Sequence, residues 1–418
     1  MMKKIFILSS LVISALLIEA QAPTQPNFVL IIADDLNDYV QGFDGHPQAK
    51  TPNIAKIAKK GTTFTNAYCA GPKCAPSRTS LITGKDAYYT KVYNNDDIGC
   101  KNFRKNFTAE KGNETVFTMP ELLKDSGGYF TYMLSKVMHC YVGLPDYDTS
   151  NVPACEKDLS WSKAFSYGQG GDMDPILDYG GANDDGVNGF FFTPIPDSME
   201  TQMVDYIITD SAIAFIEDYA SNPENYCDKP FFLTFGYKRP HGPFYVPEKY
   251  FLPYYNTDYY QDPYNKPYND PVGATPFNGL VMPPQPDPMW SDYDALPDDL
   301  VGKILNEEDY VHPDFLQFGD IMMAEVPPPP IGVGLSDEEK TFILQESERA
   351  NGIIAYLASI KFMDAQIGRF YNEIKSHPEI FNNTVFIITS DHGYSLGEKT
   401  HWRKGCMWET DVRIPLVI

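Results

Sequence analysis

Positive charge is scarce in this 418-residue sequence, which has 33 Lys and Arg residues against 56 Asp and Glu residues, a formal net charge of −23. Nucleic-acid-binding proteins normally carry a basic face for the phosphates, so this balance argues against that class. It argues equally against adhesion to anionic lipid. It does not exclude a small anionic substrate, because the local field of a pocket can oppose the global charge.

Long hydrophobic runs are also lacking. The longest one spans the fourteen residues 5–18, after Lys3 and Lys4 and before Ala20, a small residue suited to cleavage. Because this run is short for a membrane span, we predict a signal peptide over 1–20, with a membrane anchor as the alternative. We therefore expect the chain in the secretory pathway, in a lysosome or outside the cell, or in the periplasm of a bacterium.

Cysteine usage fits a secreted chain. The number of cysteines is odd, and an odd number leaves one thiol without a disulfide partner. The remaining six would allow up to three bridges, whose pairing the sequence leaves open. Sequons at Asn106, Asn113 and Asn382 are compatible with glycosylation. The cysteines are Cys69, Cys74, Cys100, Cys140, Cys155, Cys227 and Cys406.

Short apolar runs alternate with helical patterns along the chain. Near-continuous apolar runs are typical of buried parallel strands, and their alternation with helices predicts a doubly wound, mainly parallel α/β sheet. The predicted strands are 28–33, 129–134, 231–236, 385–389 and 415–418. The predicted helices are 51–60, 119–125, 203–219 and 337–375, the last in one or two pieces with Ile353, Leu357, Ile360, Ile367, Phe370 and Ile374 on one face.

Two stretches depart from this alternation. Residues 243–330 hold 17 of the 34 prolines, and proline removes backbone donors, so central strands and long helices are not expected there. We predict an ordered surface insertion, which either forms part of a substrate rim or is a spacer. Residues 413–418 have the pattern of a strand just beginning, so we expect a C-terminal subdomain to be missing or truncated.

Three polar clusters follow predicted strands or lie in turns. Asp34-Asp35 and Asp391-His392 each come after a strand, at the sheet edge where α/β proteins bind ligands. Adjacent carboxylates repel unless a cation lies between them, and oxygen ligands suit Ca²⁺ or Mg²⁺. Taken singly, either cluster is also explained as a solvated turn or a helix cap.

The third cluster is Cys74-Ala-Pro-Ser-Arg78, followed by Thr83-Gly84. A thiol beside an arginine would have a lowered pKa and could act as a nucleophile. In a secreted protein the same cysteine could instead be half of a disulfide.

The third cluster resembles the signature of the type I sulfatases, Cys-x-Pro-Ser-Arg with Thr-Gly five residues further on. Other motifs stand in the family's order, so the resemblance runs from residue 27 to 418 and implies a sulfatase catalytic domain with the alkaline-phosphatase-like fold. The motifs are Asn27 to Asp35, Thr118 to Ser126, Lys136-Val-Met-His139, Ser390 to Gly393 and Trp402 to Lys404; Gly236 to Phe244, Asp364 to Gly368 and Asp391-His392 look most like the iduronate-2-sulfatase branch.

The resemblance implies a sulfuric ester hydrolase acting on a sulfated sugar or glycosaminoglycan. Cys74 would be oxidised to formylglycine by a formylglycine-generating enzyme, and the aldehyde hydrate would be the nucleophile. One Ca²⁺ would contact this residue and stabilise negative charge on the sulfate. Its other ligands would be Asp34, Asp35, Asp391 and His392.

The remaining roles also come from the resemblance. Arg78 and Lys136 would anchor the hydrate, and Lys136 and Lys404 would bind sulfate oxygens. His139 would accept the proton of the second hydroxyl. His241, with Lys404, would protonate the departing alcohol.

Two departures leave the sugar open. Ser135 precedes Lys136 where the family usually has glycine, and Arg239 stands where the iduronate branch has lysine. The alternatives are a phosphohydrolase of the same superfamily with unmodified Cys74, and a non-catalytic glycan-binding pseudo-sulfatase.

Overall fold

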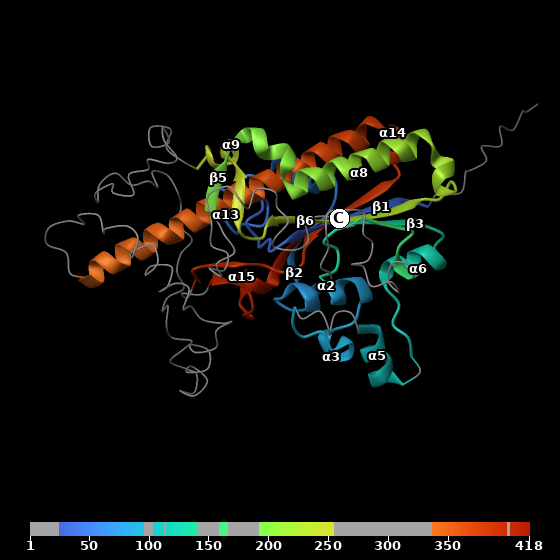
Figure 1. The fold of residues 1–418 in the computed structure, drawn as a ribbon, viewed down its shortest axis with the longest axis horizontal. Coiled ribbons are helices and arrows are strands. Elements are labelled where there is room, and N and C mark those ends of the chain that lie inside the picture. Colours follow the sequence, from blue (N-terminus) through green and yellow to red (C-terminus); the bar gives the residue numbers. More distant parts are fainter. Residues whose placement is uncertain are drawn as a thin grey trace, which may run out of the picture.

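The computed structural model describes residues 25–95, 103–112, 114–139, 159–165, 192–254, 337–398 and 402–418 (Figure 1). In these residues the main element is a seven-stranded sheet, with the order β2-β11-β8-β1-β6-β3-β4. Strands β8, β1, β6, β3 and β4 are parallel, and β11 is antiparallel to both of its neighbours. The bounds are β1 (Asn27–Asp34), β2 (Thr63–Tyr68), β3 (Phe130–Ser135), β4 (Lys163–Phe165), β6 (Phe231–Pro240), β8 (Thr384–Ser390) and β11 (Arg413–Val417).

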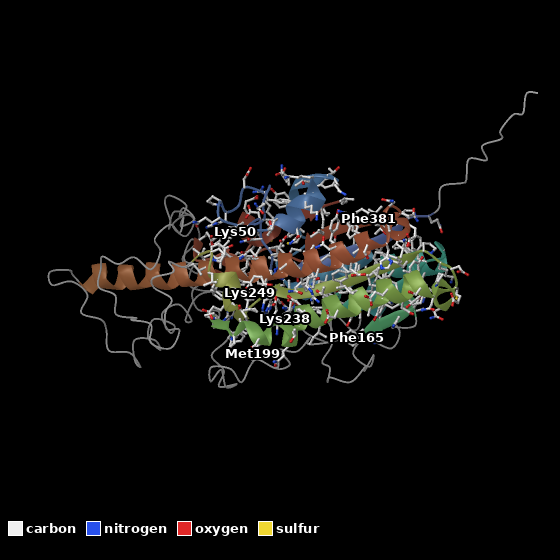
Figure 2. The ribbon with its side chains drawn as sticks, turned by 90° about the horizontal axis from the view of Figure 1, so that it is seen from above. Lys50, Phe165, Met199, Lys238, Lys249 and Phe381 are labelled. Atoms are coloured by element: carbon white, nitrogen blue, oxygen red, sulfur yellow. The ribbon has the colours of Figure 1, made fainter. Side chains whose placement is uncertain are left out.

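Helices cover both faces of this sheet (Figure 1). On one face, α8 (Val204–Ser221) and α13 (Asp337–Ser376) lie side by side (Figure 2), and α1 (Pro52–Ala58) contacts α13. The opposite face carries α2 (Cys74–Thr83), α3 (Ala87–Thr90), α5 (Phe103–Lys111) and α6 (Met119–Asp125). The smaller elements are β5 (Phe192–Ile195), η2 (Asp197–Gln202), η3 (Pro223–Tyr226), β7 (Phe244–Pro247), α9 (Glu248–Phe251), α14 (Pro378–Phe381), β9 (Ser395–Leu396), β10 (Trp402–Arg403) and α15 (Glu409–Val412).

The central strand β1 joins the two halves of the core. Val29, Ile31 and Ala33 pack into the cluster shared with α8 and α13, whereas Leu30 and Ile32 pack into the cluster on the other face. This alternation is the two-residue period of a strand whose faces are both covered by helices. The predicted apolar face of α13 is confirmed, because all six residues named for it are at most 1% exposed.

The mainly parallel α/β architecture is confirmed, and the predicted strands and helices agree with the structure to within a few residues at their ends. Helix α2 differs from the prediction, which placed the Cys74 cluster in a turn. Pro76 lies in the first turn of α2, where its missing N–H costs no hydrogen bond, and Gly84 ends the helix in the left-handed conformation. The cysteine motif is therefore a helix N-terminus.

The proline-rich stretch is described only at its start. There β7 pairs in parallel with β5, outside the main sheet, and α9 follows. Residues 255–330 of the predicted insertion lie outside the described residues, as do the predicted signal peptide 1–20 and the sequon residue Asn113. No helix in the described part of the chain has the length and apolar character needed to cross a membrane.

Candidate active site

Two adjacent strand ends bring together four of the predicted ligands. Asp34 ends β1 and Asp35 follows it with a backbone φ of +66°. Because β8 runs parallel to β1 up to the last residues of both strands, Asp391 and His392 leave the sheet beside this pair. All four residues are at most 1% exposed.

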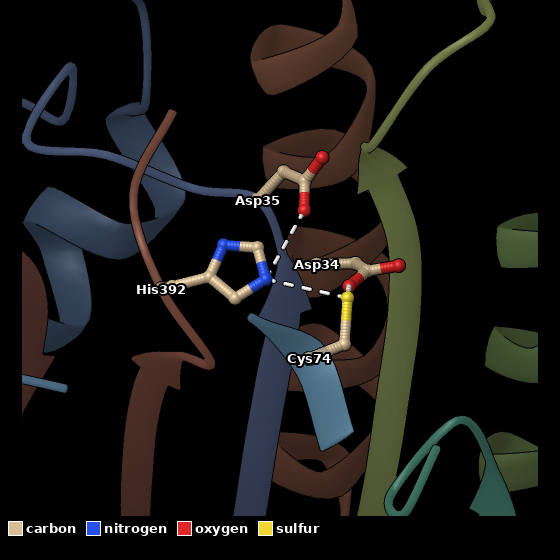
Figure 3. A group of neighbouring side chains, drawn as sticks. All are labelled: Asp34, Asp35, Cys74 and His392. Atoms are coloured by element: carbon tan, nitrogen blue, oxygen red, sulfur yellow. Dashed lines mark hydrogen bonds and ion pairs between the residues drawn. The ribbon is translucent and has the colours of Figure 1, made fainter. Parts of the chain in front are cut away.

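Cys74 points into this group from the N-terminus of α2 (Figure 3). Its Sγ lies 3.3 Å from His392 Nε2 and 3.7 Å from Asp34 Oδ1, and the residue is 1% exposed. Ligand atoms of Asp34, Asp35, Cys74 and His392 all lie within 4.8 Å of one another. Helix, strand end and loop therefore converge on one small volume.

Two lysines complete the surroundings of the thiol. Lys136 follows β3, and its Nζ lies 3.8 Å from Cys74 Sγ and forms an ion pair with Asp34. Lys404 follows β10, and its Nζ lies 3.0 Å from Cys74 Sγ and 2.5 Å from Asp35 Oδ1. Both predicted sulfate-binding lysines thus reach the predicted nucleophile.

Arg78 lies one turn further along α2 and is 0% exposed. Its Nε donates to Asp391 Oδ2 at 2.8 Å, its Nη2 donates to Asp34 Oδ1 at 3.1 Å, and its Nη1 donates to the Lys136 carbonyl. One guanidinium therefore ties the ends of three strands together. Three of its five N–H groups thus donate to the protein, and the predicted contact with the hydrate stays a prediction.

The two predicted proton-transfer histidines differ in placement. His241 follows β6, its Nε2 lies 3.9 Å from Asp35 Oδ2, and 35% of its side chain is exposed. His139 has a buried Nδ1 with no hydrogen-bond partner among the described residues, and no described hydrogen bond joins it to Cys74. The structure therefore brings His241 into the group, and the role of His139 stays a prediction.

Protonation follows from burial and neighbouring charge. Burial raises the pKa of the Cys74 thiol, but Lys136 and Lys404 together outweigh it and hold that pKa well below its usual range. Burial likewise raises the pKa of Asp34, and the surrounding cations, Lys136 first, reverse the shift. Both shifts therefore favour the anionic forms of Cys74 and Asp34 in this arrangement.

At the end of β8 the pKa shifts have the opposite direction, because the pKa values of Asp391 and His392 are both raised. Burial raises the pKa of Asp391 to about 7 although Arg78 opposes it. Burial lowers the pKa of His392, but Asp391 and Cys74 together outweigh this effect and raise it to about 9. Burial lowers the pKa of His241, which makes its protonated form a stronger acid.

The donor set fits a hard divalent cation. Asp34 and Asp35 supply carboxylate oxygens, and the amino groups that contact them, from Lys136 and Lys404, already neutralise this charge as a cation would. A sulfur at position 74 is a soft ligand, whereas an oxygen there would match the carboxylates. Asp391 is less available than predicted, since Oδ1 accepts the N–H groups of Asp35 and His392 and Oδ2 accepts from Arg78.

Several supporting residues were not predicted. Ser77 donates to the Asp391 carbonyl, and Asn95 Oδ1 accepts the Ala75 N–H at 2.9 Å at the start of α2. Ser77 lies inside the signature motif, which was the one available signal. Nothing in the sequence marks Asn95.

Arg239 stands where the iduronate branch has lysine, and the structure buries it at 1% exposed. The bearing of this departure on the sugar stays a prediction. The Arg239 Nε donates to the Tyr245 carbonyl at 3.2 Å and its Nη1 to the His241 carbonyl at 3.1 Å. Its charge therefore supports the turn that carries His241.

The fold and the site together define a class. A mainly parallel α/β sheet holds a thiol of lowered pKa, paired carboxylates and two lysines at its carboxyl edge, which is the composition of a metal-assisted group-transfer site. The family model described as "Sulfatase" matches residues 26–418. The chain belongs to the sulfatase family.

Individual proteins are similar to this chain over most of its length. The chain is 29% identical over 402 residues to a sulfatase of Formosa agariphila, covering 94% of this chain and 63% of that protein. It is 25% identical over 393 residues to human iduronate 2-sulfatase, covering 94% and 59%. A phosphonate monoester hydrolase of Agrobacterium radiobacter has the same fold, with a TM-score of 0.59, 17% identity, and coverage of 94% and 68%. The chain thus spans about three fifths of the curated relatives' length.

Proposed function

We propose that this protein is a sulfuric ester hydrolase that removes sulfate from a sulfated sugar or glycosaminoglycan. The observation that carries the proposal is the surroundings of Cys74, whose Sγ lies 3.0 Å from Lys404 Nζ, 3.3 Å from His392 Nε2 and 3.8 Å from Lys136 Nζ. Three cationic or potentially cationic groups face one nucleophile in a chain of the sulfatase family. This local field suits a sulfate group although the whole chain has a charge of −23.

The nucleophile would be formylglycine made from Cys74 by a formylglycine-generating enzyme. The hydrated aldehyde supplies two geminal hydroxyls, one to attack sulfur and one whose ionisation releases sulfate and restores the aldehyde. A calcium ion held by Asp34, Asp35, His392 and Asp391 would polarise a sulfate oxygen and lower the pKa of the attacking hydroxyl.

The chain's own side chains do the remaining work. Lys136 and Lys404 bind the sulfate oxygens and offset their charge in a water-poor site. His241, which is partly exposed beside Asp35, donates a proton to the oxygen of the departing alcohol. His139 accepts the proton of the second hydroxyl. Arg78 holds the strand ends in place.

The substrate class rests on similarity and charge together. Human iduronate 2-sulfatase is among the relatives, and the motifs around Arg239 and Asp364 resemble that branch. We propose a sulfated carbohydrate as substrate, and a lysosomal, extracellular or periplasmic location reached through the secretory pathway.

The second candidate is a phosphohydrolase with unmodified Cys74. The phosphonate monoester hydrolase has a similar fold, although at 17% identity this likeness concerns the fold alone. Phosphatases of this superfamily use two metal ions, whereas the described residues contain one group of potential ligands. This difference favours the sulfatase.

Two measurements on the same preparation test the proposal. Mass spectrometry of the peptide containing Cys74 is expected to find formylglycine, while the peptide with Cys227, an exposed thiol, keeps its cysteine. Turnover of an aryl sulfate is expected to exceed turnover of the matching aryl phosphate. An active enzyme with an unmodified Cys74 thiol would sink the mechanism, and preference for the phosphate would favour the second candidate. Binding of sulfated glycan without turnover of either ester would indicate a pseudo-sulfatase.

A further inference from the structure

The backbone of Asp35 is the least relaxed part of the candidate metal site. Its φ of +66° lies in the left-handed region, which a residue with a Cβ rarely adopts without support. The left-handed turn sends the Asp35 carboxylate away from the direction that a continued strand would give it. In this position the carboxylate meets Lys404 at 2.5 Å, His392 at 3.5 Å and His241 at 3.9 Å. The geometry of the site therefore depends on what holds this turn.

Three side chains hold the turn by hydrogen bonds to its backbone. The Asp35 N–H donates to Asp391 Oδ1 at 3.1 Å, and the Leu36 N–H donates to Ser390 Oγ at 2.9 Å. Both acceptors belong to the neighbouring strand end. The third comes from α13, where the Tyr356 hydroxyl donates to the Asp35 carbonyl at 2.6 Å and accepts the Asn37 N–H at 2.9 Å. One hydroxyl thus bridges the residues on both sides of Leu36.

The position of this hydroxyl is itself fixed by packing. Tyr356 is 0% exposed. Its ring stacks on Tyr394 at 5.6 Å between centroids and meets Phe244 and Tyr39 edge-on at 5.8 and 5.9 Å. Rings held on three sides leave the hydroxyl one place to point, so α13 imposes the turn on Asp35 through a rigid side chain.

We propose that Tyr356 is a positioning residue that sets the Asp35 carboxylate for a divalent cation by holding the left-handed turn. Among the described residues, the hydrogen bonds given for this hydroxyl join backbone atoms of the turn, so it acts through Asp35. This inference rests on the proposed function only for the purpose of the cation. Cation binding itself can be measured without turnover.

The test compares two tyrosines of the same helix. Tyr356→Phe removes the bridging hydroxyl and keeps the ring. Tyr371→Phe is the matched control, because Tyr371 is on α13, is 2% exposed, and has a hydroxyl without a hydrogen-bond partner among the described residues. Each full-length protein is stripped of metal and titrated with CaCl₂ by calorimetry. We expect Tyr356→Phe to weaken calcium binding about 10- to 100-fold, as loss of a supporting residue around a metal site does, and Tyr371→Phe to leave it unchanged.

A double variant separates positioning from general loosening. If Tyr356 acts through Asp35, Tyr356→Phe causes no further loss of calcium affinity in an Asp35→Ala background. Additive losses would overturn the inference, and so would equal affinities of the wild type and Tyr356→Phe or a wild type that binds no calcium. If Tyr356→Phe does not fold, Ser390→Ala removes the Leu36 acceptor instead, and an unchanged calcium affinity there overturns the inference as well.

The outcome is independent of the proposed reaction. Weakened calcium binding in Tyr356→Phe, with no turnover of any sulfate ester by the wild type, would support the inference and reject the function. Sulfate ester turnover by a wild type whose calcium affinity does not depend on Tyr356 would do the reverse.

Discussion

The apolar stretch of β1 and the carboxyl end of the same strand are equally buried and chemically opposite. Between Val29 and Ala33 every residue is at most 2% exposed and apolar, and the packing partners are aliphatic and aromatic side chains of the flanking helices. Asp34 and Asp35 are at most 1% exposed as well, yet both are acidic and contact Lys136 and Lys404. An apolar residue needs only neighbours of suitable volume, whereas a buried carboxylate needs particular partners.

The difference has a consequence for how each part responds to mutation. In the apolar stretch a substitution should cost stability and leave the site chemistry intact. At the charged end a substitution should cost activity, and it costs stability only where it leaves a buried charge without its partner. Four experiments test this division, from the largest expected effect to the smallest.

Replacing the nucleophile should affect activity alone. Cys74→Ala is expected to lower sulfate ester turnover at least about 10⁴-fold, because no other group replaces the reacting atom. Thermal melting should stay close to that of the wild type, since the side chain is small and its neighbours keep their ion pairs. The control is Cys227→Ala at an exposed thiol, with unchanged turnover. Residual activity near that of the wild type would contradict the assignment.

Arg78 should be an exception to this division, because it lies in the site and also stabilises the fold. Arg78→Met leaves Asp34 and Asp391 without their buried partner, so we expect urea unfolding to show a loss of about 3–5 kcal/mol. Arg369→Met removes a partly exposed ion pair with Asp210 and should cost about 1 kcal/mol or less. Equal losses in the two variants would show that burial of the pair is unimportant.

The apolar core that packs on β1 is tested at Ile360, which lies on the buried face of α13 in the same cluster as Val29 and is 0% exposed. Ile360→Ala is expected to lower the unfolding free energy by about 3 kcal/mol through lost transfer energy and a cavity. The kcat of the folded fraction should not change. Leu252→Ala, at a residue 43% exposed, should have little effect on either quantity. A selective loss of kcat in Ile360→Ala would contradict the division.

The smallest effect concerns a carboxylate in the apolar half. Asp364 on α13 accepts the N–H groups of Asn53 and Ile54 at 3.1 and 2.8 Å, at the start of α1, and burial raises its pKa from 3.8 to about 6. The folded chain therefore binds this proton more tightly than the unfolded chain. Stability contributed by protonation appears as the pH falls below about 6 and is complete below the unfolded pKa.

Asparagine cannot titrate, so wild type and Asp364→Asn should diverge with pH. Between pH 7 and pH 5 the wild type should gain about 1 kcal/mol of unfolding free energy relative to the variant, measured by urea denaturation at both pH values. A gain in the opposite direction would mean that the hydrogen bonds at α1 outweigh burial.

The sequence predicts the apolar half of this comparison well. Runs such as Val29 to Ile32 carry their own signal, because a strand buried on both faces must be apolar at every position. The edge strand β2 was missed, since Phe64 and Tyr68 are exposed and its pattern does not alternate cleanly. Local composition says little about a strand whose place is decided by pairing with β11.

The residues of the charged half were predicted from their motifs and from the order of those motifs. The hydrogen bonds and ion pairs between these residues were not. Cys74, Asp34, Asp391 and Lys404 were named, and the structure places them together. Arg78 binds groups 44, 58 and 313 residues away in the sequence, and no local pattern encodes such contacts. Tyr356 has the same limitation, because an aromatic residue on the apolar face of a helix has the pattern of an ordinary core residue.

Because Cys74 is 1% exposed in the folded protein, its burial limits when the thiol can be modified during biosynthesis. A modifying enzyme cannot bind a side chain that the folded protein already surrounds. Any enzymatic modification of this thiol must therefore occur on the nascent or unfolded chain. Lys404, which covers the thiol, is made 330 residues later. At a translation rate of about 5–20 residues per second, Cys74 stays uncovered for roughly 15 to 65 s. A modification of Cys74 would therefore compete in time with completion of the fold, and the late synthesis of Lys404 would favour the modification.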